Sequence, residues 1–202
     1  MFEQRPVRRL FPILLVNLIA FAIAIPILPA LAYDLGGSAA DVGYLFALQS
    51  LAQFAMAPVW GDLSDRYGRR TILVVTIAAT GVFEIVTATA NALWMLYLAR
   101  VLIGVCAGNI ATASALIADA TSADERSQGM AIVGISFGVG FTIGPALGAG
   151  IAVLPESFPG LLWQGPGILG SGLPFLFAGL LGMGAALAGF FTLEEPESQV
   201  DA

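Results

Sequence analysis

The stretch that decides the fold of this 202-residue chain is Gly61-Asp62-Leu63-Ser64-Asp65-Arg66-Tyr67-Gly68-Arg69-Arg70. It carries five charged side chains and two glycines, and it separates two long apolar runs. Each run has about 20 residues, the length that an α-helix needs to cross a bilayer. We therefore expect this decapeptide to form a short cytoplasmic turn between two membrane helices.

The composition is that of a membrane protein. Hydrophobic residues make up 58% and charged residues 11% of the chain, and the mean hydropathy is +0.89. Soluble domains carry about 25% charged residues, so this chain lacks the polar surface of a water-soluble globule. The eight cationic residues are all arginines and form no basic patch, so no nucleic-acid partner is expected. The sequence has no histidine and shows no nucleophile–base pair or metal-ligand cluster. We therefore expect neither an enzyme nor a metal or cofactor site.

Six apolar runs predict six membrane helices, which makes the expected fold all-α. Runs of about 20 residues without strict alternation indicate helices, because barrel strands need only about ten. The first run is too long for the apolar segment of a signal peptide, which has about 7–15 residues. Residues 1–193 are expected to form one six-helix transmembrane bundle, and residues 194–202 an acidic cytoplasmic tail. The expected spans are Leu10–Tyr33, Asp41–Trp60, Thr71–Ala90, Leu93–Ala118, Gln128–Leu154 and Leu173–Leu193.

The arginines predict the orientation of these helices. With an even number of spans, both ends of the chain lie on the same side of the membrane. Loops on the cytoplasmic side are enriched in arginine and lysine. We therefore expect both termini in the cytoplasm, and an integral protein of the bacterial inner membrane. Seven of the eight arginines fall on the side of the termini: Arg5, Arg8, Arg9, Arg66, Arg69, Arg70 and Arg126.

Polar residues are unevenly distributed among the expected spans. The first, second, fourth and fifth spans carry amide and hydroxyl side chains, whereas the sixth is almost purely apolar. Polar side chains inside a membrane usually face a cavity or a partner helix. We therefore expect the first, second, fourth and fifth spans to surround a substrate cavity, and the sixth span to face lipid. The alternative is that the polar groups only make hydrogen bonds between helices, each worth about 1 kcal/mol or less. The expected cavity residues are Asn17, Gln49, Gln53, Asn109 and Ser136.

The decapeptide resembles motif A of the major facilitator superfamily, which lies in the cytoplasmic loop between the second and third helices of these transporters. We expect Gly61 to let two helix ends approach closely and Gly68 to adopt a positive φ. Asp65 should pair with an arginine, whereas Arg69 and Arg70 should reach toward lipid phosphates. The matching residues are Gly61, Leu63, Asp65, Arg66, Gly68, Arg69 and Arg70.

A second resemblance concerns Arg100, which is followed by Gly104 and Gly108 as in motif B of the same superfamily. The resemblance implies that this membrane arginine takes part in proton coupling; the alternative is an arginine that snorkels to the interface. In the drug–proton antiporter branch, an aspartate usually stands where this chain has Asn17. An amide cannot titrate, so Glu84 in the third span is the remaining candidate for proton exchange, unless it faces a partner helix or the interface.

The fifth span contains a third resemblance. Motif C, which marks the antiporter branch, is similar to the stretch that includes Gly140, Gly144, Pro145 and Gly148. Three of these residues are glycines spaced four apart, which places them on one helix face. A plain glycine packing face is therefore the alternative interpretation.

Asp119 ends the fourth span and completes a proposed charge cluster. In the superfamily, an acid at this position pairs with motif A. The resemblance therefore implies a gate cluster of Asp65, Arg69 and Asp119, formed when the transporter opens outward and broken when it opens inward. The alternative is that Asp119 only caps a helix or faces water.

These motifs together make the chain most similar to the tetracycline-efflux-like drug–proton antiporters, from Pro6 to about Pro196. The resemblance implies two inverted three-helix repeats, which form half of the usual twelve-helix protein. Export of small amphipathic organic compounds by proton antiport would then need a second half around the cavity. A homodimer is the favoured arrangement, and a separate C-terminal half or a truncated half are the alternatives. A non-transporting membrane subunit or assembly factor is the hypothesis from a different functional class.

Overall fold

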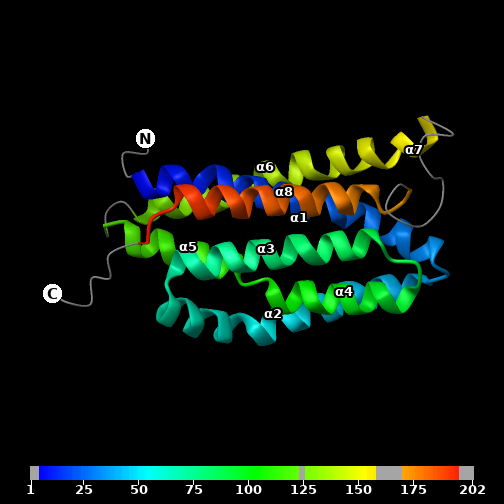
Figure 1. The fold of residues 1–202 in the computed structure, drawn as a ribbon, viewed down its shortest axis with the longest axis horizontal. Coiled ribbons are helices and arrows are strands. Elements are labelled where there is room, and N and C mark those ends of the chain that lie inside the picture. Colours follow the sequence, from blue (N-terminus) through cyan, green and yellow to red (C-terminus); the bar gives the residue numbers. More distant parts are fainter. Residues whose placement is uncertain (1–4, 123–125, 158–169, 196–202) are drawn as a thin grey trace.

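The fold is that of a computed structural model, which describes residues 5–122, 126–157 and 170–195. Within these ranges the chain is helical and contains no strand (Figure 1). The helices are α1 (Arg5–Asp34), α2 (Ala39–Tyr67), α3 (Arg69–Ala88), α4 (Leu93–Cys106), α5 (Asn109–Ala120), α6 (Arg126–Ala152), α7 (Leu154–Ser157) and α8 (Leu173–Thr192).

Six helical segments are long and apolar enough to cross a membrane, which confirms the all-α membrane fold expected from hydropathy. Five of them are single helices, and the fourth consists of α4 followed by α5. The acidic tail expected at 194–202 falls mostly outside the described residues. Its first two residues, Glu194 and Glu195, follow Leu193, the residue after the end of α8.

The packing has the symmetry expected of two three-helix repeats. The symmetry relates each of the first three spans to the matching one of the last three, so that the first corresponds to the fourth and the second to the fifth. The contact of α1 with α6 (first and fifth spans) therefore corresponds to that of α4 with α2 (fourth and second spans), and both pairs pack together. The contact of α1 with α8 likewise corresponds to that of α4 with α3. Successive spans run in opposite directions (Figure 1), so the first and fourth spans are antiparallel and the repeats are inverted.

The sequence predicted a turn over residues 61–70, and this prediction is wrong because the observed turn is much shorter. α2 continues to Tyr67 and α3 begins at Arg69, so Gly68 alone separates them, with the expected positive φ of 95°. Charge pairs at i, i+4 spacing favour the helical continuation. Arg66 contacts Asp62 at 3.1 Å, and Arg69 contacts Asp65 at 2.5 Å across the break.

The fourth span was expected to be continuous, and it is broken at Ala107 and Gly108. The cause is a tryptophan from the neighbouring helix. The indole Nε1 of Trp60 donates a 2.6 Å hydrogen bond to the carbonyl oxygen of Val105, which the helix no longer uses. A Cβ at Gly108 would lie only 2.5 Å from Cγ of Trp60, so the close approach requires glycine.

The sixth membrane helix, α8, has a packed face as well as an outer face. Its small residues lie against α3, where a Cβ on Gly179 would come within 2.6 Å of the carbonyl oxygen of Gly81. Large apolar residues, including Leu187 and Phe191, are exposed on the other side. The sixth span therefore does not face outward on all sides, and only the outer side of α8 is free to meet lipid.

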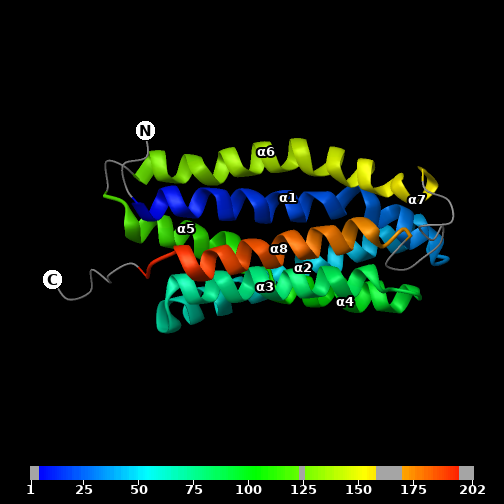
Figure 2. The same ribbon diagram turned by 45° about the horizontal axis from the view of Figure 1, so that its top comes forward.

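α1 lies between α6 and α8 (Figure 2), and glycines bring α6 close to it. A Cβ on Gly144 would lie 2.5 Å from Cβ of Ala22, and one on Gly148 would lie 2.6 Å from the carbonyl oxygen of Ile23. Gly140 similarly faces Leu18. The three glycines of the predicted packing face thus all serve this contact, as small residues do in membrane bundles.

Replacing Gly144 by alanine should destabilise the bundle, because the added methyl group would overlap Ala22. Overpacking of this kind costs about 1–3 kcal/mol. Gly138→Ala is the matched control on the same helix, since a Cβ there meets nothing within 4 Å. Thermal unfolding in detergent should show a lower Tm for Gly144→Ala alone. Equal Tm values for the two variants would contradict the close contact between α1 and α6.

Candidate functional site

A buried ion pair lies at the centre of the candidate site. Nη2 of Arg100 in α4 is 2.8 Å from Oε2 of Glu84 in α3, and the two residues are only 2% and 5% exposed. Nη2 also donates to Oγ1 of Thr87 at 3.0 Å, and Nη1 donates to Oε1 of Gln49 at 3.5 Å. Buried charges need such partners, because an isolated ion in an apolar interior is very costly.

Arg100 therefore does not snorkel to the interface, which was the alternative expected from the sequence. Its guanidinium also lies over the ring of Phe175 in α8, with Cζ 5.7 Å from the ring centroid, an arrangement typical of a cation–π contact. Three neighbouring helices, α2, α3 and α8, thus hold this one side chain.

The sequence singled out Arg100 and Glu84 separately and missed their pairing. A signal was present, because Glu84 lies eight residues before Ala92 and Arg100 eight residues after it. A tight turn near Ala92 places both residues at the same depth in two antiparallel helices. Glu84 thus faces a partner helix, and that helix carries its counter-charge.

Two small cavities flank the ion pair. One has a volume of about 50 Å³, and its lining includes Asn17, Gln53 and Glu84. The other has a volume of about 100 Å³, and its lining includes Gln49, Gln53 and Arg100. The predicted cavity residues Asn17, Gln49 and Gln53 are therefore brought to the ion pair.

The other two predicted cavity residues are not part of this arrangement. Ser136 in α6 is fully buried and lines neither cavity, and its hydroxyl has no hydrogen-bond partner among the described residues. The side chain of Asn109 lies outside the described part of the chain. Sequence reasoning missed Phe21, which lines both cavities, because an aromatic residue in an apolar run gives no polar signal.

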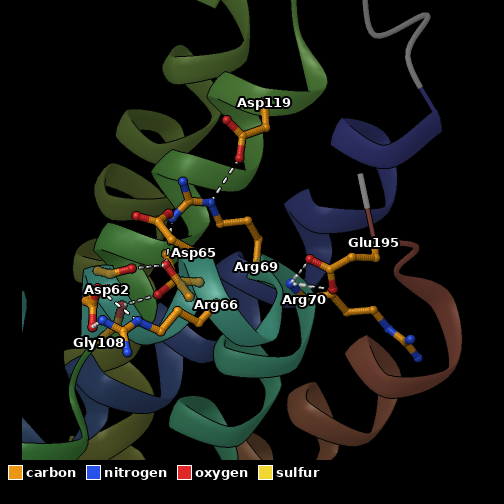
Figure 3. Close-up of polar contacts among 11 residues, drawn as sticks. Asp62, Asp65, Arg66, Arg69, Arg70, Gly108, Asp119 and Glu195 are labelled. Carbon is orange, nitrogen blue, oxygen red and sulfur yellow. Dashed lines mark hydrogen bonds and ion pairs between the residues drawn. The ribbon is translucent and has the colours of Figure 1, made fainter. Parts of the chain in front are cut away.

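A second charge cluster lies at the end of the bundle where α2 and α5 end and α3 begins (Figure 3). We call this the motif A end of the bundle. Nε of Arg69 donates to Oδ2 of Asp119 at 2.9 Å, and Nη1 lies 2.5 Å from Oδ1 of Asp65. Nη1 also donates to the hydroxyl of Ser64 at 2.6 Å, and Ser64 is almost fully buried. The structure thus brings the three predicted cluster residues together and adds Ser64, which the sequence analysis missed.

Two expectations for motif A are wrong. Arg69 does not reach toward lipid phosphates, because the acids of the cluster hold its guanidinium. Arg70 donates from Nη2 to the carbonyl oxygen of Phe190 and lies 5.4 Å from the centroid of that ring. A Cβ on Gly61 would meet nothing within 4 Å in the described part of the chain, so none of the described helices approaches closely there.

The chain after α8 returns to motif A. The carboxylate of Glu195 accepts hydrogen bonds from the backbone N–H of Arg70 at 3.2 and 3.3 Å, which caps the start of α3 (Figure 3). Arg9 donates to Glu194 and, at 3.2 Å, to the carbonyl oxygen of Thr192. These contacts attach the end of α8 to α1 and α3.

The opposite end of the bundle has a simpler polar contact. The hydroxyl of Tyr97 in α4 donates a 2.7 Å hydrogen bond to Oδ1 of Asp41 in α2. Asp41 also closes a capping box with Ser38 at the start of α2. In the described part of the chain, no three or more acidic or cysteine side chains form a group that could hold a metal ion.

Known proteins share this sequence pattern. A sequence model described as the Major Facilitator Superfamily matches residues 10–202. The class C tetracycline resistance protein of Escherichia coli is 34% identical over 180 residues, which are 88% of this chain and 42% of that protein. Major facilitator superfamily domain-containing protein 10 of Bos taurus is 36% identical over 176 residues, 73% of this chain and 39% of that protein.

Solved structures share the fold. The human organic anion transporter MFSD10 (TETRAN) superposes with a TM-score of 0.76 and 29% identity, covering 96% of this chain and 48% of that one. A bacterial homologue of the human lysosomal transporter Spinster, inward-facing and unoccupied, gives a TM-score of 0.82 with 98% and 45% coverage. Its 21% identity shows the fold alone. The chain spans less than half the length of these relatives.

Proposed function

The chain belongs to the major facilitator superfamily, and we propose that it works in the export of small amphipathic organic compounds by proton antiport. Two similar proteins carry names that favour this class of substrate, a tetracycline resistance protein and an organic anion transporter. The orientation follows the arginine distribution, with both termini in the cytoplasm of a bacterial cell and the bundle in its inner membrane.

The observation that carries the proposal is the buried pair of Arg100 and Glu84. Ionisable residues inside membrane bundles are costly, and they mark substrate or proton pathways. The pair lies beside both cavities, and Glu84 shares one of them with Asn17. Proton uptake by Glu84 would remove the counter-charge of Arg100 and change how α3 and α4 interact. This gives Glu84 the proton-exchange role that Asn17 cannot fill, and gives Arg100 the role of its partner.

The cavities support a second bundle in the working transporter. Sites for drug-sized ligands have volumes of about 300–1,000 Å³, whereas the two cavities here have about 50 and 100 Å³. α2 also leaves large apolar residues uncovered, among them Tyr44 and Phe54, which are 61% and 79% exposed. A second copy inserted in the same orientation would enlarge the cavity between the two bundles and cover part of α2. A separate C-terminal half would serve equally in place of the second copy.

The cluster of Asp65, Arg69 and Asp119 is proposed as the gate at the motif A end. It links the α2–α3 corner to the end of α5, so its charges would separate when this end opens. Gly140, Gly144, Pro145 and Gly148 would keep α6 close to α1 while the gate moves, which is the role we propose for motif C.

Transport is tested with the full chain in proteoliposomes. Tetracycline is the first probe, because several similar proteins are named for resistance to it. The native chain should give substrate-dependent proton flux, and Arg100→Ala should lower it to the level of empty liposomes, since Glu84 then lacks its partner. Arg126→Ala is the matched control, because Arg126 is exposed at the start of α6. Absence of flux with tetracycline and with a panel of amphipathic compounds would favour the alternative, a non-transporting membrane subunit or assembly factor.

The gate is tested by the reactivity of a single cysteine. In a Cys106→Ala background, Ile110→Cys places a thiol at the wall of the 50 Å³ cavity. Asp119→Asn should raise the rate of its maleimide labelling from the motif A side by about two- to fivefold, the range for loss of a partly exposed ion pair. Asp62→Asn is the control, since among the described residues the ion pair of Asp62 is with Arg66 of the same helix. Equal labelling rates in the two variants would contradict the gate.

The homodimer is tested by the protein mass of the detergent-solubilised particle. About twice the 20.9 kDa of one chain is expected, because two bundles are needed to surround a cavity of useful size. A particle with the mass of one chain would contradict the homodimer and leave a separate second half as the arrangement to test.

A further inference from the structure

The break in the fourth span is held by hydrogen bonds that a regular helix does not make. In a continuous α-helix, the carbonyl oxygen of Val105 would accept from the backbone N–H four positions along the chain. Here it accepts at 2.6 Å from the indole Nε1 of Trp60 in α2. The N–H of Gly108 donates to the carbonyl oxygen of Cys106 at 2.8 Å, and Ala107 between them has the φ of −78° and ψ of 53° of an inverse γ-turn.

The carbonyl of Val105 therefore has two competing donors, and each belongs to a different shape of the span. A carbonyl at membrane depth needs a donor from the protein, because the hydrocarbon core supplies no water. The indole of Trp60 stands against the backbone of the break, where a Cβ on Gly108 would lie 2.5 Å from its Cγ. Without the indole N–H, the donor left to this carbonyl is the one that a continuous helix would use. The span thus has a broken and a straight arrangement that both satisfy the same group.

α4 is the anchored part of the fourth span. The buried ion pair of Arg100 holds it to α3. Gly104 brings it against α2, where an added Cβ would overlap the backbone carbonyl of Gln49. α5 contacts its neighbours through buried apolar side chains and through the ion pair of Asp119 with Arg69. Apolar contacts have no preferred direction, so a change of shape at the break would move α5 and leave α4 in place.

Such a movement is large enough to separate the gate charges. The part of α5 between Gly108 and Asp119 is about 16 Å long at the rise of an α-helix. A change in direction of about 20°, the size of a sharp kink, would displace the end of this lever by about 6 Å. Asp119 and Arg69 are 2.9 Å apart in the broken arrangement. Straightening would therefore break this ion pair without disturbing Arg100.

We propose that Trp60 is a conformational switch that acts on the gate through α5. While its indole donates to Val105, the span is broken and Asp119 reaches Arg69, and both features occur together in this structure. When the indole withdraws, the span straightens and α5 carries Asp119 away. The inference rests on the proposed function, because it states how the proposed gate opens. Trp60 is a positioning residue in this scheme.

The first test is the variant Trp60→Phe, which keeps an aromatic ring and removes the indole donor. In a Cys106→Ala background, Ala20→Cys places a reporter thiol at the wall of the 50 Å³ cavity, outside the fourth span. Trp60→Phe should raise its maleimide labelling from the motif A side by about two- to tenfold, the effect of one lost hydrogen bond. Trp94→Phe is the matched control, because Trp94 is 64% exposed at the start of α4. Equal rates in the two variants would overturn the switch.

A second variant shows whether the effect passes through the helix bond. Asn109→Pro removes the N–H that would replace the indole. It places proline at the first position of α5, where proline is favoured. By itself it should not raise labelling, and Trp60→Phe with Asn109→Pro should label at the native rate, because straightening no longer satisfies Val105. If Trp60→Phe only loosened the packing, labelling of the double variant would stay raised, which would overturn the switch.

The movement itself is measured by electron paramagnetic resonance, which decides the question if the double variant does not fold. Spin labels at Tyr67→Cys and Thr121→Cys mark the ends of α2 and α5. Trp60→Phe should increase their separation by about 5 Å, close to the displacement of the lever, and Trp94→Phe should leave it unchanged. An increase in a protein without proton flux would support the switch while the export function fails. Flux with an unchanged separation would overturn the switch and leave export standing.

Discussion

The positive charge of Arg100, buried among four helices, is the constraint on which the centre of this structure depends. An uncompensated ion cannot remain in a membrane interior at acceptable cost, so α3 must present Glu84 at the same depth. α2 adds Gln49, and α8 adds the ring of Phe175. These contacts fix the rotation of α4 about its axis. Movement of α3 relative to α4 must then either carry the ion pair along or break it.

Small residues determine where the remaining helices lie, because the hydrophobic effect does not draw helices together in lipid. Gly144 lets α6 meet α1, and the pair of Gly81 and Gly179 lets α3 meet α8. α2 follows a different pattern. It holds Gln49 toward the ion pair, yet Phe54 and Leu51 on its outer side are uncovered. The bundle is thus closely packed on one flank and open along α2, where the proposed second bundle would lie.

Much of the architecture was predictable because hydropathy and charge act locally along the chain. Six apolar runs are enough to specify six membrane helices, and Gly68 in a charged junction is enough to specify a positive φ there. Motif A also identified Asp65, Arg69 and Asp119 correctly as neighbours. The expected lengths were less accurate. The i, i+4 charge pairs extend α2 to Tyr67, and the indole of Trp60 breaks the fourth span, an effect that depends on a residue 45 positions away from Val105.

By itself, then, the sequence determined that this is a membrane protein with six apolar helices, and it named the charged residues that a bilayer could not leave unpaired. Only the tertiary structure decided which partners those residues have. It paired Arg100 with Glu84, turned Arg69 inward to its acids, joined Glu195 to the start of α3, and placed Ser136 away from the cavities. The physical reason is that burial in lipid depends on the length and polarity of a segment. Pairing depends on the rotation and depth of each helix, which packing against its neighbours sets.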